Sequence, residues 1–314
     1  MEHAQRIIFD TDMGTDVDDC LALALILSSP ELRLEGVTCV YGDANLRARM
    51  VIKLLRLRNH PELPVTVGAT EPLLGLRPVF WPGHEGLGLL EPEDEAIEPD
   101  REHAVDFIVR KVMDEPGEIH LVAVGPLTNV AMAFLREPRL SERLAHLTIM
   151  AGAIRGTSDL HLPYVEHNVR CDPEAAHVVL SSGAPITLVP LDVTTKVRIT
   201  PEGVDRIRST GTAFNEAVAR QVEMYPRFAE QGYTYLHDPL ALAALVAPDL
   251  LSTQPLHVDV ELGGRHTAGA TLVRTAAEGE SPDTRVALGV EAEAFEEFFL
   301  TRLEEAEAGV SSRG

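Results

Sequence analysis

The sequence is poor in cysteine, tryptophan and basic residues, and it contains no long hydrophobic run. Its three cysteines, Cys20, Cys39 and Cys171, are widely spaced and form no C-x-x-C pair, which argues against a disulfide framework or a zinc site. We expect them to be reduced residues of the core. The longest uninterrupted apolar run covers residues 20–27, far short of the roughly 20 residues that a membrane-spanning helix needs.

The shortage of basic residues gives the chain a strong negative charge. Lys and Arg total 27 against 49 Asp and Glu, so the formal net charge is −22. Such a chain repels phosphate backbones and anionic membranes, and we expect neither nucleic acid nor a membrane as a partner. The acidic stretches 91–103 and 295–309 are expected to be solvated faces. Residues 1–6 are too polar for a signal peptide, which predicts a soluble, cytoplasmic protein.

Strand-like and helix-like segments alternate along the chain. The 314 residues are 45% apolar and carry no linker or low-complexity tract, so we expect one domain over 1–314. The pattern predicts an α/β fold with a doubly wound, largely parallel central sheet flanked by helices. Predicted strands cover 6–9, 34–42, 65–67, 119–124, 147–150 and 186–190, and predicted helices cover 20–30, 46–58, 104–113, 129–136, 173–181 and 240–248.

Five carboxylates lie in the ten-residue segment D-T-D-M-G-T-D-V-D-D at 10–19, between a predicted strand and a predicted helix. Two like charges about 5 Å apart repel by roughly 3 kcal/mol at an effective dielectric of about 20. A helix N-terminus offsets only about 0.3–1 kcal/mol per acid. Helix capping would explain one acid, Asp16 or Asp18, and Gly14 and Leu21 do not fit an EF-hand. The cluster therefore predicts a bound divalent cation.

Polar residues also follow three other predicted strands or precede helices. The turn G-P-L-T-N at 125–129 comes after one strand, the segment E-H-N at 166–168 with D-P-E-A-A at 172–176 comes after another, and H-D-P at 237–239 opens an apolar helix. Each segment alone is a helix-start signal. In an open α/β sheet, however, loops at the carboxyl ends of strands are where ligands bind.

Taken together, these four segments resemble the inosine-uridine preferring nucleoside hydrolases, in similar order and spacing over most of the chain. The resemblance implies a Rossmann-like fold, a calcium ion, and hydrolysis of the N-glycosidic bond of a nucleoside to free base and ribose. Its implied calcium ligands are Asp12, Asp19, the backbone carbonyl of Thr128, and Asp238. Asp12 matches the general base that acts on a metal-bound water, and His237 matches the donor of a proton to the leaving base.

The same resemblance suggests which residues hold the substrate. Asp18 and Asn168 match groups that bind the ribose 2′- and 3′-hydroxyls, Glu166 would reach the 5′-hydroxyl, and Asp10 would fix its neighbours. His84 is expected in the pocket, Asp43 and Asn45 in a ribose-contacting loop, and 73–88 as a mobile lid. Relatives suggest a homodimer or homotetramer.

The chain departs from the family pattern in two places. Leu160 stands where many members have Asn, with Asp159 or His161 as possible substitutes, and Asp43 stands where Asn is common. This leaves room for 5′-modified nucleosides or another N-glycoside as substrate. Asp16 has no counterpart, because the acidic loop is two residues longer than the commonest family form.

Two other functions compete with a nucleoside hydrolase. The strand followed by Asp10-Thr11-Asp12 could belong to a haloacid-dehalogenase-like phosphatase with magnesium, although Gly14 disfavours that motif. The chain could also be a calcium-dependent nucleoside or sugar binding protein without turnover. Release of free base discriminates the hydrolase from both.

Overall fold

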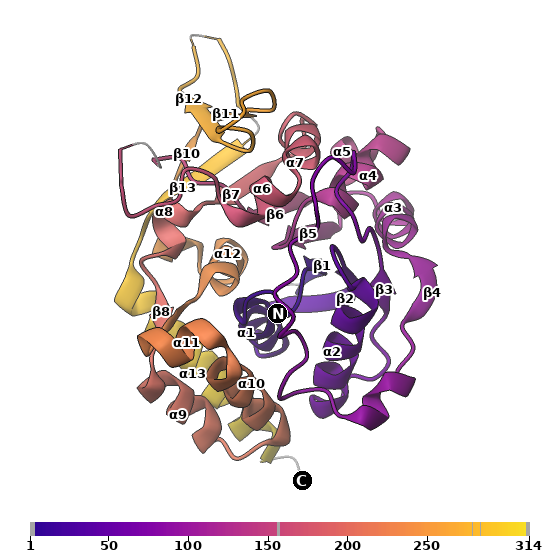
Figure 1. The fold of residues 1–314 in the computed structure, drawn as a ribbon, viewed down its shortest axis with the longest axis vertical. Helices are drawn as coiled ribbons and strands as arrows, with labels where there is room; N and C mark the ends of the chain where they lie inside the picture. The colour runs from indigo at the N-terminus through magenta and orange to yellow at the C-terminus, as the bar shows by residue number, and fades with distance from the viewer. Residues whose placement is uncertain (1–3, 156–157, 278, 283, 312–314) are drawn as a thin grey trace.

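The computed structural model describes residues 4–155, 158–277, 279–282 and 284–311. In this part of the chain a nine-stranded sheet runs through the molecule with helices on both faces (Figure 1). The strand order is β10-β13-β7-β6-β5-β1-β2-β3-β4, and every pair is parallel except β10–β13. The predicted doubly wound, largely parallel sheet is confirmed.

The sheet strands are β1 (Gln5–Thr11), β2 (Leu32–Cys39), β3 (Val65–Val67), β4 (Asp100–His103), β5 (Ile119–Ala123), β6 (His146–Met150), β7 (Ile186–Val189), β10 (Leu251–Pro255) and β13 (Thr284–Val290). Two small antiparallel pairs stand apart from it, β8 (Arg198–Ile199) with β9 (Thr234–Tyr235) and β11 (His257–Val260) with β12 (Thr271–Arg274).

The α-helices are α1 (Asp18–Leu27), α2 (Ala44–Leu57), α3 (Ala104–Asp114), α4 (Thr128–Arg136), α5 (Leu140–Arg143), α6 (His167–Cys171), α7 (Pro173–Leu180), α8 (Leu191–Thr194), α9 (Pro201–Ser209), α10 (Ala213–Met224), α11 (Pro226–Gln231), α12 (His237–Val246) and α13 (Ala292–Ser311). Short 3-10 turns lie at η1 (Pro92–Ala96) and η2 (Pro248–Leu250). Figure 1 shows α9, α10, α11 and α13 gathered at one end of the molecule.

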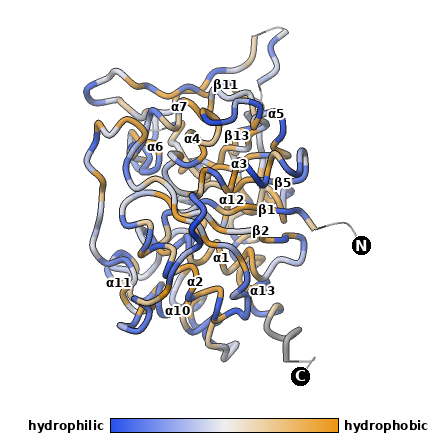
Figure 2. Tube along the Cα trace, turned by 90° about the vertical axis from the view of Figure 1, so that its right-hand side faces the viewer, coloured by the Kyte–Doolittle hydropathy of each residue, from blue (hydrophilic) through white to orange (hydrophobic). Residues whose placement is uncertain are grey.

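The two faces of the sheet follow from the alternation of side chains along each strand. In β1, Ile7 and Phe9 join the apolar cluster that contains α1, α2 and α12, whereas Ile8 joins the cluster that contains α3, α4 and α7. Because helices cover both faces, the central strands are apolar throughout. Figure 2 shows this hydrophobic colour concentrated around β1 and α12.

The acidic stretches present solvated faces, as expected, and both also belong to elements of the fold. Residues 295–309 fall in α13, which buries Phe295, Phe299 and Leu303 at a spacing of four residues, so the helix packs one face on the core. Residues 91–103 include β4, the edge strand of the sheet, where the Asp100 carboxylate accepts a hydrogen bond from the Val65 N–H (2.8 Å).

The cysteine prediction is confirmed, since Cys20, Cys39 and Cys171 are free and buried. Among the described residues, no helix is long and apolar enough to cross a bilayer.

The order of strands creates a crevice beside β1. From β1 the chain adds β2, β3 and β4 on one side and then returns to place β5 on the other side. The loops that leave β1 and β5 therefore separate toward opposite faces at the carboxyl ends of these strands, which is where open α/β sheets bind ligands. The acidic segment 12–19 follows β1 at this point.

Candidate functional site

A cavity of about 540 Å³ lies in this crevice. Residues from the ends of four sheet strands and from the start of α12 meet in its wall. They include, among others, Asp12, Asp16, Asp18, Asp19, His84, Val124, Met150, Glu166, Asn168, His237 and Asp238. The structure thus brings together all but three of the predicted site residues.

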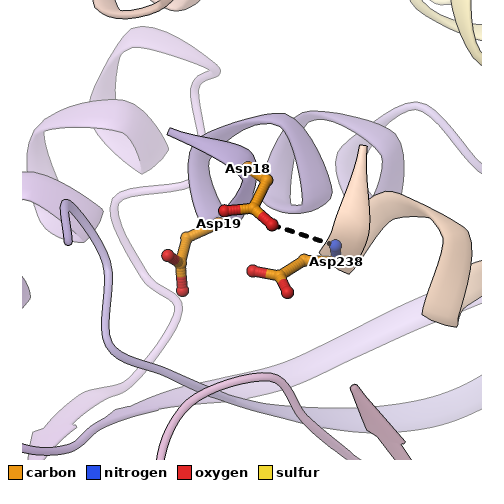
Figure 3. A group of neighbouring side chains, drawn as sticks. All are labelled: Asp18, Asp19 and Asp238. Atoms are coloured by element: carbon orange, nitrogen blue, oxygen red, sulfur yellow. Dashed lines mark hydrogen bonds between the residues drawn. The ribbon is translucent and has the colours of Figure 1, made fainter. Parts of the chain in front are cut away.

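The floor of the cavity carries three buried carboxylates. Oxygen atoms of Asp18, Asp19 and Asp238 all lie within 4.8 Å of one another. Figure 3 shows Asp18 and Asp19 at the start of α1 and Asp238 at the start of α12. Asp18 Oδ2 accepts a hydrogen bond from the Asp238 N–H (3.2 Å), and the Thr11 hydroxyl donates to Asp19. We call these three residues the acidic triad.

The acidic triad has more negative charge than its surroundings offset. Burial is the largest cause that raises the pKa of each carboxyl well above its usual range, and repulsion between the aspartates raises it further. Arg47 lies close enough to lower the pKa of Asp19 in part, but its guanidinium donates to the backbone carbonyls of Tyr41, Asp12 and Met13. Hard oxygen donors in a buried acidic site match a divalent cation such as calcium.

Asp12 stands beside the acidic triad at the end of β1, and it is 4% exposed. Gly125 makes room for it, because a Cβ at that position would lie 2.9 Å from Asp12 Oδ1. Behind it, Asp10 Oδ1 accepts hydrogen bonds from the Thr38 hydroxyl (2.5 Å) and Asn129 Nδ2 (2.8 Å). Burial raises the pKa of Asp10 to about 7. Asp10 is fully buried and does not line the cavity. This position suits the predicted role of orienting its neighbours.

Asp16, which the sequence left without a role, connects the acidic loop to the helical end of the molecule. Its Oδ2 accepts a hydrogen bond from the Tyr225 hydroxyl (2.8 Å) and lies 4.0 Å from Arg227 Nη1. Its Oδ1 accepts from the Val17 N–H (2.6 Å). No side chain caps α1, whose N-cap is Val17, so the capping explanation for Asp16 or Asp18 was wrong.

Of the three histidines that line the cavity, His84 and His237 were predicted from the sequence, and His167 was not. His237 Nδ1 is 2.7 Å from the hydroxyl of the buried Thr194. Burial, reinforced by the charge of Arg227, lowers the pKa of His237 to about 3, so the ring is neutral near pH 7. The ring of His84 lies 5.8 Å from that of Tyr225, and its buried Nε2 has no hydrogen-bond partner within the described residues. Both side chains are placed to meet a ligand.

Glu166 and Asn168 are held rigidly at the start of α6. The Glu166 carboxylate accepts hydrogen bonds from the N–H groups of Asn168 (2.7 Å), Gly152 (2.9 Å) and Val169 (3.1 Å). Asn168 Nδ2 donates to the carbonyl of Val124 (2.6 Å). These contacts fix the wall of the cavity with few free rotations, an arrangement that favours ligand binding.

The structure places three predicted residues outside the cavity. Thr128, whose backbone carbonyl was the predicted ligand, stands in the first turn of α4 and does not line the cavity, whereas Val124 does. The Thr128 hydroxyl donates to Asp172 Oδ2 (2.6 Å). Asp43 is exposed and caps α2 by accepting from the Leu46 N–H (2.9 Å). Asn45 is exposed in the first turn of α2. A ribose contact by Asp43 or Asn45 is therefore a wrong prediction.

The loop around residue 160 also differs from expectation. Leu160 is 93% exposed, and neither it nor Asp159 or His161 lines the cavity. The wall on this side is formed instead by Pro163, His167 and Phe80. Phe80 belongs to the segment predicted as a lid, which contributes to the wall in the conformation described.

Sequence reasoning missed the part of the site that comes from the helical end. Tyr225, Arg227, Glu230 and Gln231 line the cavity from the junction of α10 and α11 and from α11 itself. They precede the H-D-P segment at 237–239 by several residues and carry no motif of their own. Only the unexplained Asp16 gave a sign that such a partner existed.

Comparison with known proteins agrees with this geometry. The family model for inosine-uridine preferring nucleoside hydrolase matches residues 7–297. A pyrimidine-specific ribonucleoside hydrolase, RihA, from Klebsiella pneumoniae is 34% identical over 310 residues, which cover 96% of this chain and 98% of that protein. A probable uridine nucleosidase 1 from Oryza sativa is 32% identical over 281 residues, 86% of this chain and 85% of that protein.

Solved structures are similar over the same length. The purine-preferring ribonucleoside hydrolase from Gardnerella vaginalis has a TM-score of 0.86 and 30% sequence identity, covering 96% of this chain and 99% of that chain.

The sheet, the acidic crevice and these relatives define a hydrolase that acts on N-glycosyl bonds. The chain belongs to the inosine-uridine preferring nucleoside hydrolase family, and it is an enzyme that hydrolyses nucleosides. Family membership sets aside the phosphatase alternative.

Proposed function

We propose that the protein hydrolyses the N-glycosidic bond of ribonucleosides to free base and ribose, with calcium bound at the acidic triad and Asp12. The observation that carries this proposal is the convergence of buried carboxylates at the sheet crevice, inside a cavity of about 540 Å³. A cavity of this volume suits a small-molecule ligand.

Asp12, Asp19 and Asp238 would hold the ion, and the position of Asp18 in the triad suggests that it contributes as well. Calcium accepts six to eight oxygen ligands, so sugar hydroxyls could complete its coordination. When bound, the ion lowers the pKa of water and orients the sugar. It would also offset the repulsion that raises the pKa of the three triad carboxyls.

Different residues of the chain act at the two ends of the scissile bond, the sugar and the base. Asp12 accepts the proton of the attacking water while the new C1′–O bond forms and the C1′–N bond breaks. The surrounding carboxylates stabilise the positive charge that develops on the sugar. Asp18 and Asn168 hold the 2′- and 3′-hydroxyls, and Glu166 reaches toward the 5′-hydroxyl.

The departing base takes the electron pair of the C1′–N bond, and we assign to His237 the donation of a ring N–H to that base. The hydrogen bond between His237 Nδ1 and Thr194 fixes the ring, and Tyr225, Arg227 and His84 line the cavity with it. Because Arg227 and Tyr225 line the same cavity as His237, we expect the α10–α11 junction to lie on the side of the base. The names of the relatives divide between pyrimidine-specific and purine-preferring enzymes, so the base preference is left open.

Asp12→Asn tests the proposed general base. We expect base release from a nucleoside to fall by about 10²–10⁴-fold, because general base catalysis contributes that much. The released nucleobase is measured by chromatography. At saturating calcium, this assay distinguishes loss of the general base from weaker metal binding. Asp249→Asn, which changes an exposed acid outside the cavity, is the control.

Near-normal turnover of Asp12→Asn would remove Asp12 as the base. Tight nucleoside binding by wild-type protein in calorimetry, with no base released over hours, would instead support a binding protein.

A further inference from the structure

A fully buried arginine, Arg47 of α2, supports the turn that begins the acidic loop. Its Nη1 donates to the carbonyl of Asp12 and to that of Met13 (2.9 Å), and its Nη2 donates to the hydroxyl of Thr15 (2.8 Å). The Asp12 carbonyl also accepts from the Thr15 N–H (3.3 Å), which closes the turn. Because a guanidinium is planar and its N–H directions are fixed, these contacts determine where the Asp12 backbone lies.

The same guanidinium contacts the 73–88 segment. Arg47 Cζ lies 4.9 Å from the centre of the Trp81 ring, which is a cation–π contact. Gly42 allows this approach, because a Cβ at that position would lie 2.6 Å from Trp81 Cε3. Trp81 itself does not line the cavity of the site, but its neighbour Phe80 does. The position of Trp81 therefore affects a wall of that cavity.

Tyr41 makes a second connection between Arg47 and this segment. Its carbonyl accepts a hydrogen bond from Arg47 Nε (2.7 Å), and its hydroxyl accepts one from the Phe80 N–H (2.9 Å). Tyr41 is itself buried. The segment is thus joined to Arg47 twice, through Tyr41 and through the ring of Trp81, so that the acidic loop and the segment share one point of support.

The charge of Arg47 is not matched by a carboxylate at hydrogen-bond distance. Its four acceptors are carbonyl and hydroxyl oxygens. The charge instead lowers the pKa of Asp19, against the larger effects of burial and of Asp12. A guanidinium is costly to bury, and the four hydrogen bonds and the ring contact offset that cost. Arg47 does not line the cavity, so it acts on a ligand only through the residues that it holds.

We propose that Arg47 is a positioning residue of the active site: it holds Asp12 where it binds calcium, and it couples that position to the 73–88 segment through Trp81. This inference rests on the proposed function, in which Asp12 is a calcium ligand and the general base. Coupling between two sites is reciprocal. Calcium at the acidic loop should therefore strengthen the contact between Arg47 and Trp81, and loss of this contact should weaken calcium binding.

Arg47→Lys tests the positioning of Asp12. Lysine keeps the positive charge but lacks the planar fork, so it cannot hold the three oxygens of the turn together. We expect the calcium affinity measured by calorimetry to fall by roughly 10–100-fold, as for other residues that orient metal ligands. At saturating calcium, kcat for a nucleoside should fall more than KM changes. Arg302→Lys is the matched control, because Arg302 pairs with Glu31 and contacts the Phe298 ring at 4.9 Å outside the cavity.

The fluorescence of Trp81 tests the coupling, because Trp81 is the only tryptophan of the chain. In wild type we expect its emission to change as calcium is added, with a midpoint at the calorimetric Kd, and we expect no such change in Arg47→Lys. Trp81→Leu removes the aromatic face and should weaken calcium binding by roughly 2–30-fold, the range that a cation–π contact contributes. Trp81→Phe keeps an aromatic ring and should weaken it less.

Unchanged calcium affinity in Arg47→Lys, with only a loss of thermal stability, would assign Arg47 a structural role and overturn the proposal. Calcium binding by wild type without a change in Trp81 emission would overturn the coupling, as would wild-type affinity in Trp81→Leu. These two measurements decide the coupling even if Arg47→Lys does not fold. If wild type neither binds calcium nor releases base from a nucleoside, the proposed function itself has failed.

Discussion

The acidic triad, formed by Asp18, Asp19 and Asp238, is a functional site that lowers the stability of the folded protein. Each carboxyl is buried and has its pKa raised by burial and by its neighbours. Like charges at this range cost about 1–3 kcal/mol per pair at an effective dielectric near 20. Without a cation, the folded state therefore retains a repulsion that the unfolded chain does not have.

Asp238→Asn should separate the repulsion within the acidic triad from the stabilisation that bound calcium provides. In the presence of a chelator we expect the variant to be more stable than wild type by about 1–3 kcal/mol, because one like charge is removed. Calcium should stabilise wild type through preferential binding to the folded state and stabilise the variant much less. Thermal unfolding with chelator and with calcium gives both quantities. Asp205→Asn, an exposed acid with a side chain that is 79% accessible, is the control; equal calcium shifts in wild type and Asp238→Asn would contradict the assignment.

The residues that the sequence correctly assigned to the cavity are ones whose side chains have few alternative uses. Asp12, Asp19 and Asp238 stood in motif segments and meet in one cavity. Thr128 and Asp43 stood in motif-like turns too, yet neither lines the cavity, and the Asp43 side chain caps α2 instead. A side chain that can also satisfy local backbone or buried groups gives an ambiguous signal, and only the fold decides between its uses.

The acidic loop and the α10–α11 junction are connected through Asp16, which accepts a hydrogen bond from Tyr225 and lies 4.0 Å from Arg227. Tyr225 and Asp16 are 209 residues apart in the chain. The junction is also held locally, since the Tyr225 N–H donates to the Gln221 carbonyl (3.1 Å) and its carbonyl accepts from the Ala229 N–H (3.2 Å). The contacts of Asp16 therefore join two walls of the cavity that no local pattern brings together.

Tyr225→Phe removes the hydrogen bond to Asp16 while keeping the ring. Since hydrogen bonds to charged groups contribute about 1.5–3 kcal/mol, we expect KM for the nucleoside to rise by roughly 10–100-fold, with a smaller change in kcat. Steady-state kinetics measures both constants. Asp16→Asn, which retains an acceptor oxygen, should have a milder effect than Asp16→Ala; equal loss in the two variants, or an unchanged KM in Tyr225→Phe, would rule out this function of the contact.

At this scale, periodicity predicted the elements of the sheet core but not the helical end. The run 119–124 gave β5, and the segment 46–58 gave α2, each within two residues of the observed bounds. The helices α9 to α11 and α13 were not predicted, because their apolar stripes are narrow and interrupted by charges, as in the spacing of Phe295, Phe299 and Leu303. The residues of the α10–α11 junction, which line the cavity on the expected side of the nucleobase, were missed for the same reason.

At the scale of the whole molecule, Glu35 links two neighbouring strands of the sheet, β1 and β2, with helix α3. Its carboxylate on β2 pairs with Arg6 of β1 (2.7 Å), with Lys111 of α3 (2.7 Å) and with Arg33 (3.1 Å), and its side chain is 8% exposed. These partners, led by the hydrogen bond from Arg6, lower the pKa of Glu35 to about 2. A folded-state pKa below the unfolded value stabilises the protein above the unfolded pKa, and this stabilisation is lost as pH falls.

Glu35→Gln should therefore destabilise the protein at pH 7 by about 1–3 kcal/mol, the range for charged hydrogen bonds. The difference from wild type should narrow as pH falls from about 4.5 toward 2. Urea unfolding at several pH values measures it. The control is Glu62→Gln, whose side chain is 68% exposed; a difference that stays constant with pH would contradict the assigned pKa shift.

The topology of the whole chain is what made so much of the site predictable. Because β1 and β5 are neighbours at the point where the chain reverses direction across the sheet, polar residues after these strands had to meet. The side of the cavity formed by this reversal could be predicted from the sequence. The side closed by α11 and the loop at Phe80 depends on long-range packing, which no local sequence pattern indicates.

Base release from a panel of purine and pyrimidine nucleosides, measured by chromatography with calcium, after chelation and after calcium is restored, tests the central claim most directly. The acidic triad predicts release that is lost on chelation and recovered on re-addition of calcium. Release that continues unchanged in chelator, with no metal retained by the protein, would contradict a calcium-dependent nucleoside hydrolase.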